Sequence, residues 1–292
     1  MKFSMAVLLG AQALYRANLK GVENGEFPDG RSELLNFYDI QYIANITLGS
    51  PAQDLTVLLD TNFADFWVPS SKCEHSIGSG FACLNHNRYN SDLSITSRED
   101  GRNMTLQTSQ GTISGFQTLD NLTTPYDGVL GLGRIGLSAN GVVPVFERLL
   151  SSAAVSEPLI GLSFDRNPLD VSSSGELTWG GVNSEKFEGD FPADFQNFQS
   201  ISDDYWTLNL NKVTSSDFAF EFCSSGCLGR VSTGSAFITG PRDQVRQINE
   251  HLGAVESIDG YWFFFCELVH RMPSLKFFLD GLPFTMDPDL SS

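Results

Sequence analysis

Short apolar or alternating segments, separated by turn-forming residues, dominate the chain. The clearest are IQYIANITL (40–48), QDLTVLL (53–59), FADFWV (63–68), MTLQT (104–108), PLIGLSF (158–164) and FFFCELV (263–269). Each is bounded by Gly, Pro, Asn, Asp or Ser, the residues that commonly end strands and form turns. The pattern therefore predicts a mainly β protein.

Two stretches have the spacing of a helix instead. Residues 144–153, within VPVFERLLSSA, predict one short helix. The segment PRDQVRQINEHLG predicts another that begins at Pro241, because proline is favoured in the first helical turn. In this second helix, Val245, Ile248 and Leu252 lie on one face. Both helices are too short to change the fold class.

Length and charge limit the function further. The 292 residues can bury a full core and correspond to one large or two smaller domains. A net charge of -17 and a pI near 4.4 disfavour nucleic acid and anionic membranes as partners. No apolar run is long enough for a transmembrane helix. We therefore expect neither a nucleic-acid nor a membrane partner.

The N-terminus has the features of a secretion signal. Met1-Lys2 precedes the apolar run FSMAVLLGAQAL, which predicts a signal peptide over 1–15; an apolar strand or helix is the alternative. Sequons begin at Asn45, Asn103 and Asn121, and exposed sequons are glycosylated in the secretory pathway. These features predict a glycoprotein that is secreted or lies in the lumen of that pathway.

Two segments resemble each other and a known family. LTVLLDTNFADFWVPSSKC (55–73) and CSSGCLGRVSTGSAFITGP (223–241) resemble the two active-site loops of pepsin-like aspartic peptidases. YDGVLGLG (126–133) resembles the segment that supports the first of these loops, and GELTWGG (175–181) resembles the strand that closes the first lobe. The resemblance implies a bilobal pepsin-like fold with a cleft for an extended peptide between the lobes.

The same resemblance divides the chain into segments. LYRANLKG resembles the start of a basic propeptide, so 16–35 is predicted to be a short propeptide-like segment. The first lobe is expected over 36–185 and the second over 186–292. The family continues with further strands after the point where this sequence stops. The second lobe is therefore expected to be incomplete, with unpaired strand edges.

The resemblance places a catalytic carboxylate at Asp60, but the second motif has Ser232 where the family has aspartate. In that family two facing carboxyl groups share one proton, which lets one accept a proton from water while the other donates a hydrogen bond. A serine hydroxyl is neither an acid nor a base near a working pH. Loss of one member of a catalytic unit commonly costs about 10⁴ to 10⁶ in rate. We therefore expect residual chemistry at most.

Other departures concern the loops and the flap. Asn62 replaces a glycine and is expected to accept a positive φ in the turn. Phe63 removes a hydroxyl that bonds the first aspartate in the family. Asp65 is expected to be a solvated loop charge, and Thr108 stands where the flap has tyrosine. The resemblance assigns the following residues to the substrate cleft: Thr61, Trp67, Thr108, Gly111, Thr233, Gly234 and Ser235.

Cysteine positions also match the family. The resemblance implies disulfides between Cys73 and Cys83 and between Cys223 and Cys227, in an oxidising compartment. Cys266 is left without a mate, which allows either a buried inert thiol or a disulfide to a second chain. The Cys-x3-Cys spacing also allows zinc, but no second ligand pair follows it. We expect no metal and no cofactor.

Three functions are compatible with the sequence. The first is a non-catalytic homologue that binds a peptide or protein in the cleft. The second is a weak aspartic endopeptidase that uses Asp60 with a water held by Ser232, or a dimer in which each chain lends its Asp60. The third is a degenerate product without a task. A dimer would form through the incomplete second lobe or Cys266. A serine hydrolase based on Ser232 is disfavoured, because its context lacks a nucleophile elbow.

Overall fold

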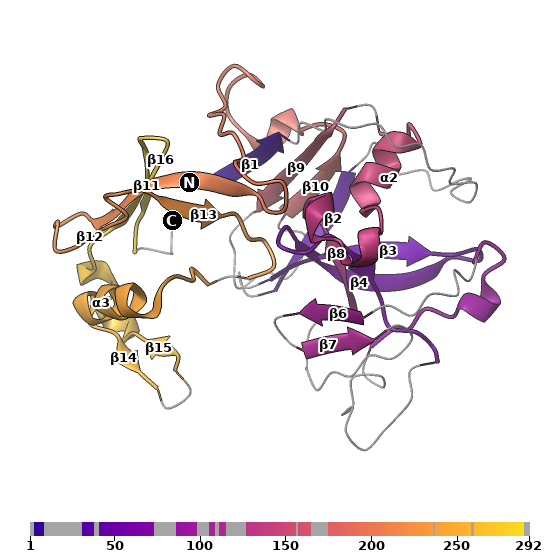
Figure 1. The fold of residues 1–292 in the computed structure, drawn as a ribbon, viewed down its shortest axis with the longest axis horizontal. Helices are drawn as coiled ribbons and strands as arrows, with labels where there is room; N and C mark the ends of the chain where they lie inside the picture. The colour runs from indigo at the N-terminus through magenta and orange to yellow at the C-terminus, as the bar shows by residue number, and fades with distance from the viewer. Residues whose placement is uncertain are drawn as a thin grey trace.

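Two separate β-sheets form the framework of the protein (Figure 1). A computed structural model describes residues 3–8, 31–37, 41–72, 86–97, 105–108, 111–114, 127–155, 157–164, 175–235, 237–257 and 260–288. The eight-stranded first sheet has the order β1-β9-β10-β2-β3-β4-β8-β5. Its strands are β1 (Phe3–Leu8), β2 (Arg31–Phe37), β3 (Gln41–Leu48), β4 (Gln53–Asp60), β5 (Phe66–Trp67), β8 (Gly128–Gly131), β9 (Leu159–Phe164) and β10 (Gly175–Trp179).

The second sheet has five strands in the order β12-β11-β16-β17, with β13 paired to β11. Its strands are β11 (Thr207–Ser215), β12 (Glu221–Phe222), β13 (Cys227–Arg230), β16 (Leu275–Leu279) and β17 (Leu282–Met286). Two hairpins lie outside both sheets: β6 (Thr105–Thr108) with β7 (Gly111–Ser114), and β14 (Val255–Glu256) with β15 (Trp262–Phe263). The predicted mainly β, bilobal fold is confirmed.

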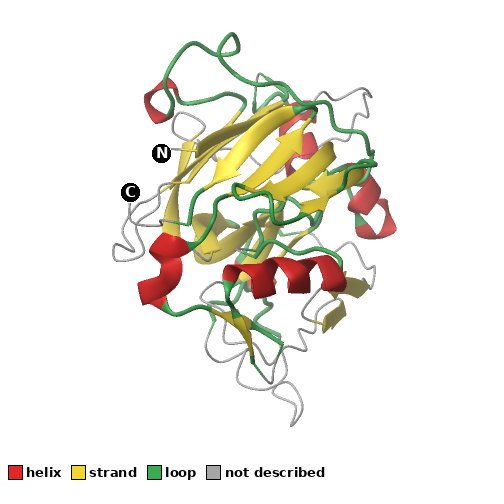
Figure 2. Ribbon diagram, turned by 90° about the vertical axis from the view of Figure 1, so that its left-hand side faces the viewer, coloured by secondary structure: helices red, strands yellow, loops and turns green. Residues whose placement is uncertain are grey.

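Helices are few among the described residues (Figure 2, in red). The α-helices are α2 (Val145–Ser151) and α3 (Arg242–Leu252), and both predicted helices are thereby confirmed. The predicted first residues, Pro144 and Pro241, are the N-cap residues. Each helix therefore begins one residue later than predicted. The 3-10 helices are η2 (Ser91–Leu93), η3 (Ile135–Leu137), η4 (Ala139–Gly141), η5 (Ser184–Lys186) and η6 (Cys266–Arg271).

Most predicted strands are present, and one is wrong. The segments predicted at 40–48, 53–59 and 158–164 correspond to β3, β4 and β9. Within 263–269, only Phe263 is in a strand, and the chain enters η6 at Cys266. The short β15 pairs with β14 alone, and Phe265 is exposed, so this aromatic run has no second strand to pair with. An apolar run becomes a strand only where a partner exists.

The first two strands fall in segments for which the sequence suggested other roles. β1 lies within the predicted signal peptide and pairs antiparallel with β9 at the edge of the first sheet. β2 overlaps the end of the predicted propeptide-like segment and pairs with β10 and β3. The signal peptide and the propeptide boundary stay predictions, because strand pairing does not address cleavage.

The buried core belongs to the first sheet. One apolar cluster covers one face of the sheet, where α2 contributes Phe146 and Leu149; a smaller cluster around Ile43, Leu58 and Val129 lies on the other. Fully burying such a side chain stabilises the fold by about 1.5–3 kcal/mol. The main cluster consists of Leu34, Ala44, Val57, Leu59, Leu130, Leu132, Phe146, Leu149, Ile160, Leu162, Leu177 and Trp179.

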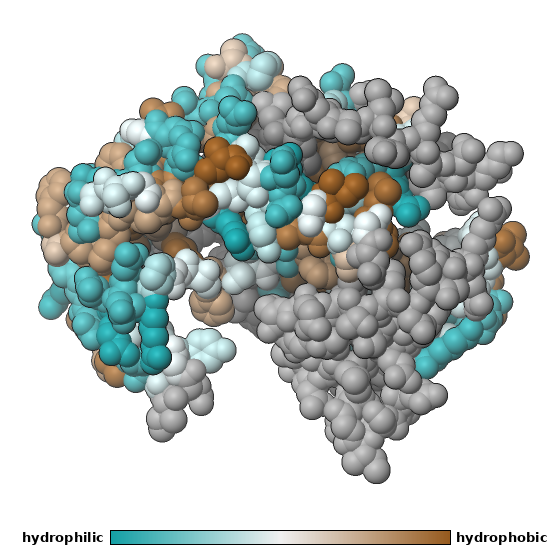
Figure 3. Space-filling model, in the orientation of Figure 1, coloured by the Kyte–Doolittle hydropathy of each residue, from teal (hydrophilic) through white to brown (hydrophobic). Residues whose placement is uncertain are grey.

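The second sheet is packed differently. Among its described large apolar residues, Val213 is buried, but β16 is only half-buried along its length. Helix α3 has no buried residue. Apolar and polar side chains are interspersed on the surface of this half of the chain, on the left in Figure 3. Its exposed large apolar residues, among those described, are Ile201, Phe218, Leu228, Phe237, Ile238, Val255, Tyr261, Phe263, Phe265, Leu268, Leu282 and Met286.

Candidate active site

The first loop, residues 60–65, begins where β4 ends at Asp60. β4 runs parallel to β8, so that Asp60 is level with Gly131, and β5 returns antiparallel along β8. The Asp60 carbonyl accepts a hydrogen bond from Leu132 N at 2.8 Å, just after β8. The buried, apolar β4 therefore delivers the aspartate to one end of β8, around which the first loop turns.

Two glycines of β8 permit this close packing. A Cβ atom on Gly131 would lie 2.5 Å from the carbonyl oxygen of Asp65. A Cβ atom on Gly128 would lie 2.2 Å from the carbonyl oxygen of Trp67. Backbone approaches this close exclude any larger residue. These contacts explain why glycine stands at both ends of the GVLG segment that supports the first loop.

The Asp60 carboxyl group is partly shielded from solvent. Its Oδ1 accepts a hydrogen bond from the backbone N–H of Asn62 at 2.8 Å. Burial raises the pKa of Asp60 above its ordinary value of 3.8, and the Asn62 hydrogen bond opposes part of that effect. A Cβ atom on Gly234 would lie 2.4 Å from the Asp60 Cγ, so the second loop touches the carboxyl group directly.

The second loop, residues 231–235, is joined to the first loop by the threonine pair, Thr61 and Thr233. Thr61 Oγ1 accepts from Thr233 N at 3.1 Å and donates to the Val231 carbonyl at 2.9 Å. Thr233 Oγ1 accepts from Thr61 N at 3.2 Å and donates to the Leu59 carbonyl at 2.8 Å. Each hydroxyl thus bonds the N–H of the other threonine and the carbonyl two residues before it, an exchange with approximate two-fold symmetry.

Ser232 lies in the second loop at the position related to Asp60 by this exchange. Its side chain is exposed, and no hydrogen bond joins it to Asp60 within the described part of the chain. Ser235 directs its hydroxyl to its own turn, where Oγ accepts from Phe237 N at 3.2 Å. The site therefore presents one carboxyl group and one hydroxyl group, and no second carboxylate pairs with Asp60 among the described residues.

Two expectations about the first loop are wrong. Asn62 does not have a positive φ; its N–H instead closes the turn onto the Asp60 carboxylate. Asp65 is not solvated, because only 4% of it is exposed. Its carboxylate accepts hydrogen bonds from Ser138 Oγ at 3.1 Å and Ala139 N at 3.0 Å, which tie the first loop to the segment after β8. The serine donor was not apparent from sequence, because it lies 73 residues away.

For the remaining predicted cleft residues, the structure gives the surroundings of Trp67 but only the strand register of Thr108 and Gly111. Trp67 is half-buried and packs on the smaller apolar cluster, next to Phe63. Its Nε1 is buried without a hydrogen-bond partner in the described residues. Thr108 and Gly111 face each other in the register of the β6–β7 hairpin, the predicted flap. Only the backbone of this hairpin is described, so its position over the site stays a prediction.

A buried carboxylate that the sequence did not single out lies just before β8, beside β4. Asp127 immediately precedes β8 and accepts hydrogen bonds from Thr56 N, Thr56 Oγ1 and Asn87 N at 2.8, 3.0 and 2.8 Å. His86 Nδ1 lies 3.4 Å from its Oδ1. The other described histidines, His251 and His270, also make no hydrogen bond to Ser232. A serine-hydrolase arrangement is therefore not formed by these groups.

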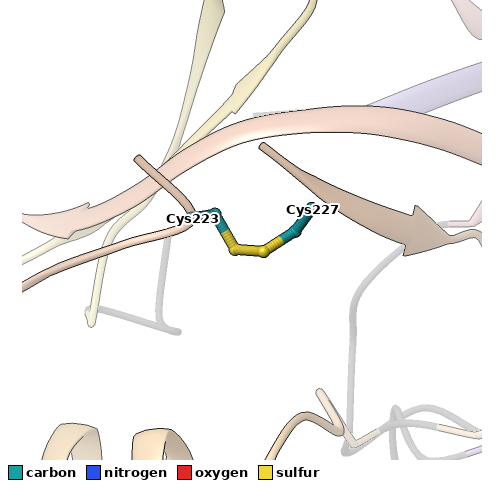
Figure 4. Close-up of a disulfide and its surroundings, with 2 residues drawn as sticks. All are labelled: Cys223 and Cys227. Carbon is teal, nitrogen blue, oxygen red and sulfur yellow. A yellow bond between two sulfur atoms is a disulfide. The ribbon is translucent and has the colours of Figure 1, made fainter. Parts of the chain in front are cut away.

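The cysteines and sequons have mixed outcomes. Cys223 and Cys227 form a disulfide with a Cα–Cα distance of 5.2 Å (Figure 4), as predicted, rather than a zinc site. Cys266 is a free, exposed thiol in η6. Asn45 is exposed on β3. The predicted positions Cys73, Cys83, Asn103 and Asn121 lie outside the described residues.

One small surface hollow, lined by residues of β9, β10 and the segment 182–195, does not include Asp60. Glu176 forms part of its wall and uses its carboxylate oxygens to bond Thr178 Oγ1 and Asn183 Nδ2, each at 3.0 Å. The Glu176 carboxylate is thus hydrogen-bonded within the protein. No described helix is long and apolar enough to cross a membrane.

Most of the chain is similar to known proteins. The family model described as eukaryotic aspartyl protease matches residues 41–125 and 121–290. Cathepsin E-B of Xenopus laevis is 30% identical over 280 residues, which cover 87% of this chain and 67% of that protein. Cathepsin E of Cavia porcellus is 31% identical over 280 residues, covering 87% and 68%. Cathepsin D of Homo sapiens is 28% identical over 315 residues, covering 96% and 74%.

Proposed function

Because the chain belongs to the eukaryotic aspartyl protease family, we propose that it is a catalytically impaired member, which binds an extended peptide or protein segment between its two loops without cutting it. The observation that carries this proposal is the combination found in the second loop. The threonine pair is complete, whereas Ser232 stands where the family's second aspartate is expected. The loops keep their mutual support and lack half of the acid–base pair.

The chemistry of Asp60 supports binding without cleavage. With a raised pKa, its carboxyl group is protonated over a wider acidic range and can donate a hydrogen bond to a peptide carbonyl. Hydrolysis needs a base for the attacking water at the same moment. One carboxyl group cannot perform both tasks together, and the Ser232 hydroxyl supplies no base. The single carboxyl therefore suits recognition of a peptide bond better than its hydrolysis.

The same proposal includes a location in the secretory pathway. The Cys223–Cys227 disulfide requires an oxidising compartment to persist. Asn45 is exposed and begins a sequon, so it is accessible for glycosylation there. Secretion from cultured cells into the medium, with a mass loss on deglycosylation that Asn45→Gln reduces, is the expected result. Retention of an unmodified chain in the cytosol would contradict this location.

Binding is tested with fluorescein-labelled β-casein, an unfolded protein, at about pH 4, within the range where aspartate titrates. We expect saturable fluorescence anisotropy, with the casein intact on a gel after incubation. Asp60→Ala removes the carboxyl group and is expected to weaken binding. Asp54→Ala is the matched control, because Asp54 is an exposed carboxylate on the same strand. Equal binding by wild type and Asp60→Ala would exclude the proposed site, and cleaved casein would indicate the weak endopeptidase instead.

A further inference from the structure

A closed ring of hydrogen bonds passes through the two loops and Trp206. The indole Nε1 of Trp206 donates to the Leu132 carbonyl at 3.0 Å, and Leu132 N donates to the Asp60 carbonyl at 2.8 Å. In the other direction, the Trp206 carbonyl accepts from Val231 N at 3.0 Å. The Val231 carbonyl accepts from Thr61 Oγ1 at 2.9 Å, which closes the ring at the residue after Asp60.

Trp206 is held firmly in this place. Only 7% of the residue is exposed. The guanidinium of Arg134 lies over its ring, 5.4 Å from the centroid, and donates from Nη1 to the Ser202 carbonyl at 2.6 Å. Gly136 packs so closely against Asp204 that a Cβ atom would lie 2.0 Å from its Oδ1. The segment before β11 is therefore docked against the turn that follows β8.

The bonds of Trp206 differ in kind from those of the threonine pair. The threonine hydroxyls join the loops directly, next to Asp60 and Ser232. Trp206 joins them indirectly, with a side-chain bond to Leu132, the residue after β8, and a main-chain bond to Val231 in the second loop. Two separate connections, through the threonine pair and through Trp206, restrain the loops more tightly than either one alone. One connection alone would leave a hinge at the threonine pair.

We propose that Trp206 is a positioning residue, which sets the relation between the two loops and thereby the peptide affinity of the site between them. This inference rests on the proposed function, because it assigns Trp206 a part in the same peptide site. Trp206 need not touch the bound peptide. Its indole N–H acts through Leu132 and the Asp60 backbone, and its carbonyl acts through Val231 and Thr61.

The test replaces Trp206 by phenylalanine, which keeps an aromatic ring and removes the N–H. The matched control is Trp262→Phe, in β15 and outside the ring of bonds. We measure the dissociation constant for fluorescein-labelled β-casein together with the amide NMR resonances and hydrogen-exchange rates of Thr61 and Thr233. We expect weaker binding for Trp206→Phe, by up to about tenfold, which corresponds to the full energy of one buried hydrogen bond. The two threonine amides should shift and exchange faster, while Trp262→Phe leaves all three readouts unchanged.

The outcomes separate the two proposals. Unchanged threonine amides and unchanged affinity in a folded Trp206→Phe chain would overturn the positioning role. Shifted amides without any casein binding by the wild type would support the positioning role and overturn the proposed function. If Trp206→Phe does not fold, Arg134→Gln tests the positioning role instead. It removes the guanidinium that lies over the Trp206 side chain and keeps the indole N–H. Arg134→Gln should shift the same amides, and unchanged amides in that variant would contradict the inference.

Discussion

At the scale of single residues, the site is defined by what faces Asp60. The sequence singled out Asp60 and Ser232 as the two motif positions, because the Asp-Thr and Ser-Thr pairs stand out in segments that resemble each other. It did not reveal that Gly234 touches the carboxyl group or that Asp65 is buried. Those facts depend on contacts between segments far apart in the chain, which local patterns do not encode. The titration and packing of Asp60 therefore follow from the structure.

The raised pKa of Asp60 predicts a pH-dependent stability difference. The folded state holds the Asp60 proton to higher pH than the unfolded state, whose pKa is near 3.8. The stabilisation from that proton is complete below the unfolded pKa and is lost as pH rises through the folded pKa. Asp60→Asn cannot titrate. Calorimetry at about pH 3 and pH 7 should show wild type losing melting temperature relative to Asp60→Asn as pH rises. A constant difference would contradict the shift.

The contact of Gly234 with Asp60 predicts a position-specific effect of one methyl group. Gly234→Ala would place Cβ 2.4 Å from the Asp60 Cγ and must displace the carboxyl group. Gly229→Ala is the control, since its Cβ would meet its nearest neighbour at 3.7 Å, an ordinary contact. We expect weaker β-casein binding and a changed Asp60 titration by carboxyl NMR for Gly234→Ala only. Equal behaviour of the two variants would show that the loops are not in contact.

At the scale of elements, β4, β8 and β11 carry the site. The apolar run 53–59 predicted β4, and the GVLG segment indicated support for the first loop. The sequence did not predict β11 or the role of Trp206, because that role depends on a hydrogen bond to Leu132, 74 residues away. It also misassigned 263–269, where apolar character is not matched by a neighbouring strand. The apolar pattern of a segment predicts a strand, but the strand forms only where a neighbouring strand can pair with it.

The threonine pair predicts a cost for losing one hydroxyl. Thr233→Val keeps the shape of the side chain but leaves Thr61 N and the Leu59 carbonyl without their partner. Leaving buried polar groups unpaired should destabilise the protein by about 1–3 kcal/mol in urea unfolding. Thr233→Ser retains the hydroxyl and should lose much less. A Thr233→Val chain as stable as Thr233→Ser would contradict the structural role of the pair.

At the scale of the whole molecule, the two halves of the chain differ in packing. The buried apolar clusters of the described residues lie on the first sheet, whereas the second sheet and α3 leave many large apolar side chains exposed. Composition could not predict this asymmetry, since both halves contain enough apolar residues for a core. The chain spans about two thirds of the length of the cathepsin E proteins it matches. Exposed apolar surface of this extent promotes association or binding.

The exposed surface of the second half predicts dye binding in the native state. A dye such as ANS, which fluoresces on apolar surfaces, should respond several-fold more strongly to this protein than to a compact control protein. Phe263→Ser with Phe265→Ser should reduce the signal, because both side chains are about three-fifths exposed, 60% and 62%. The control must not disturb the core, so it must also be at an exposed residue. Leu93→Ser, at an exposed residue of the first half, is the appropriate comparison and should leave the signal unchanged.

The two loops are joined by the threonine pair, but one carboxyl group instead of two faces the space between them. The most direct measurement is hydrolysis of β-casein by the purified, folded chain between about pH 2 and pH 7, the range in which aspartate titrates. Asp60→Ala and Ser232→Asp are assayed beside it. The prediction is no cleavage by wild type beyond that of Asp60→Ala, and detectable cleavage by Ser232→Asp, in which two carboxyl groups can again share a proton. Cleavage by wild type that disappears in Asp60→Ala would contradict it.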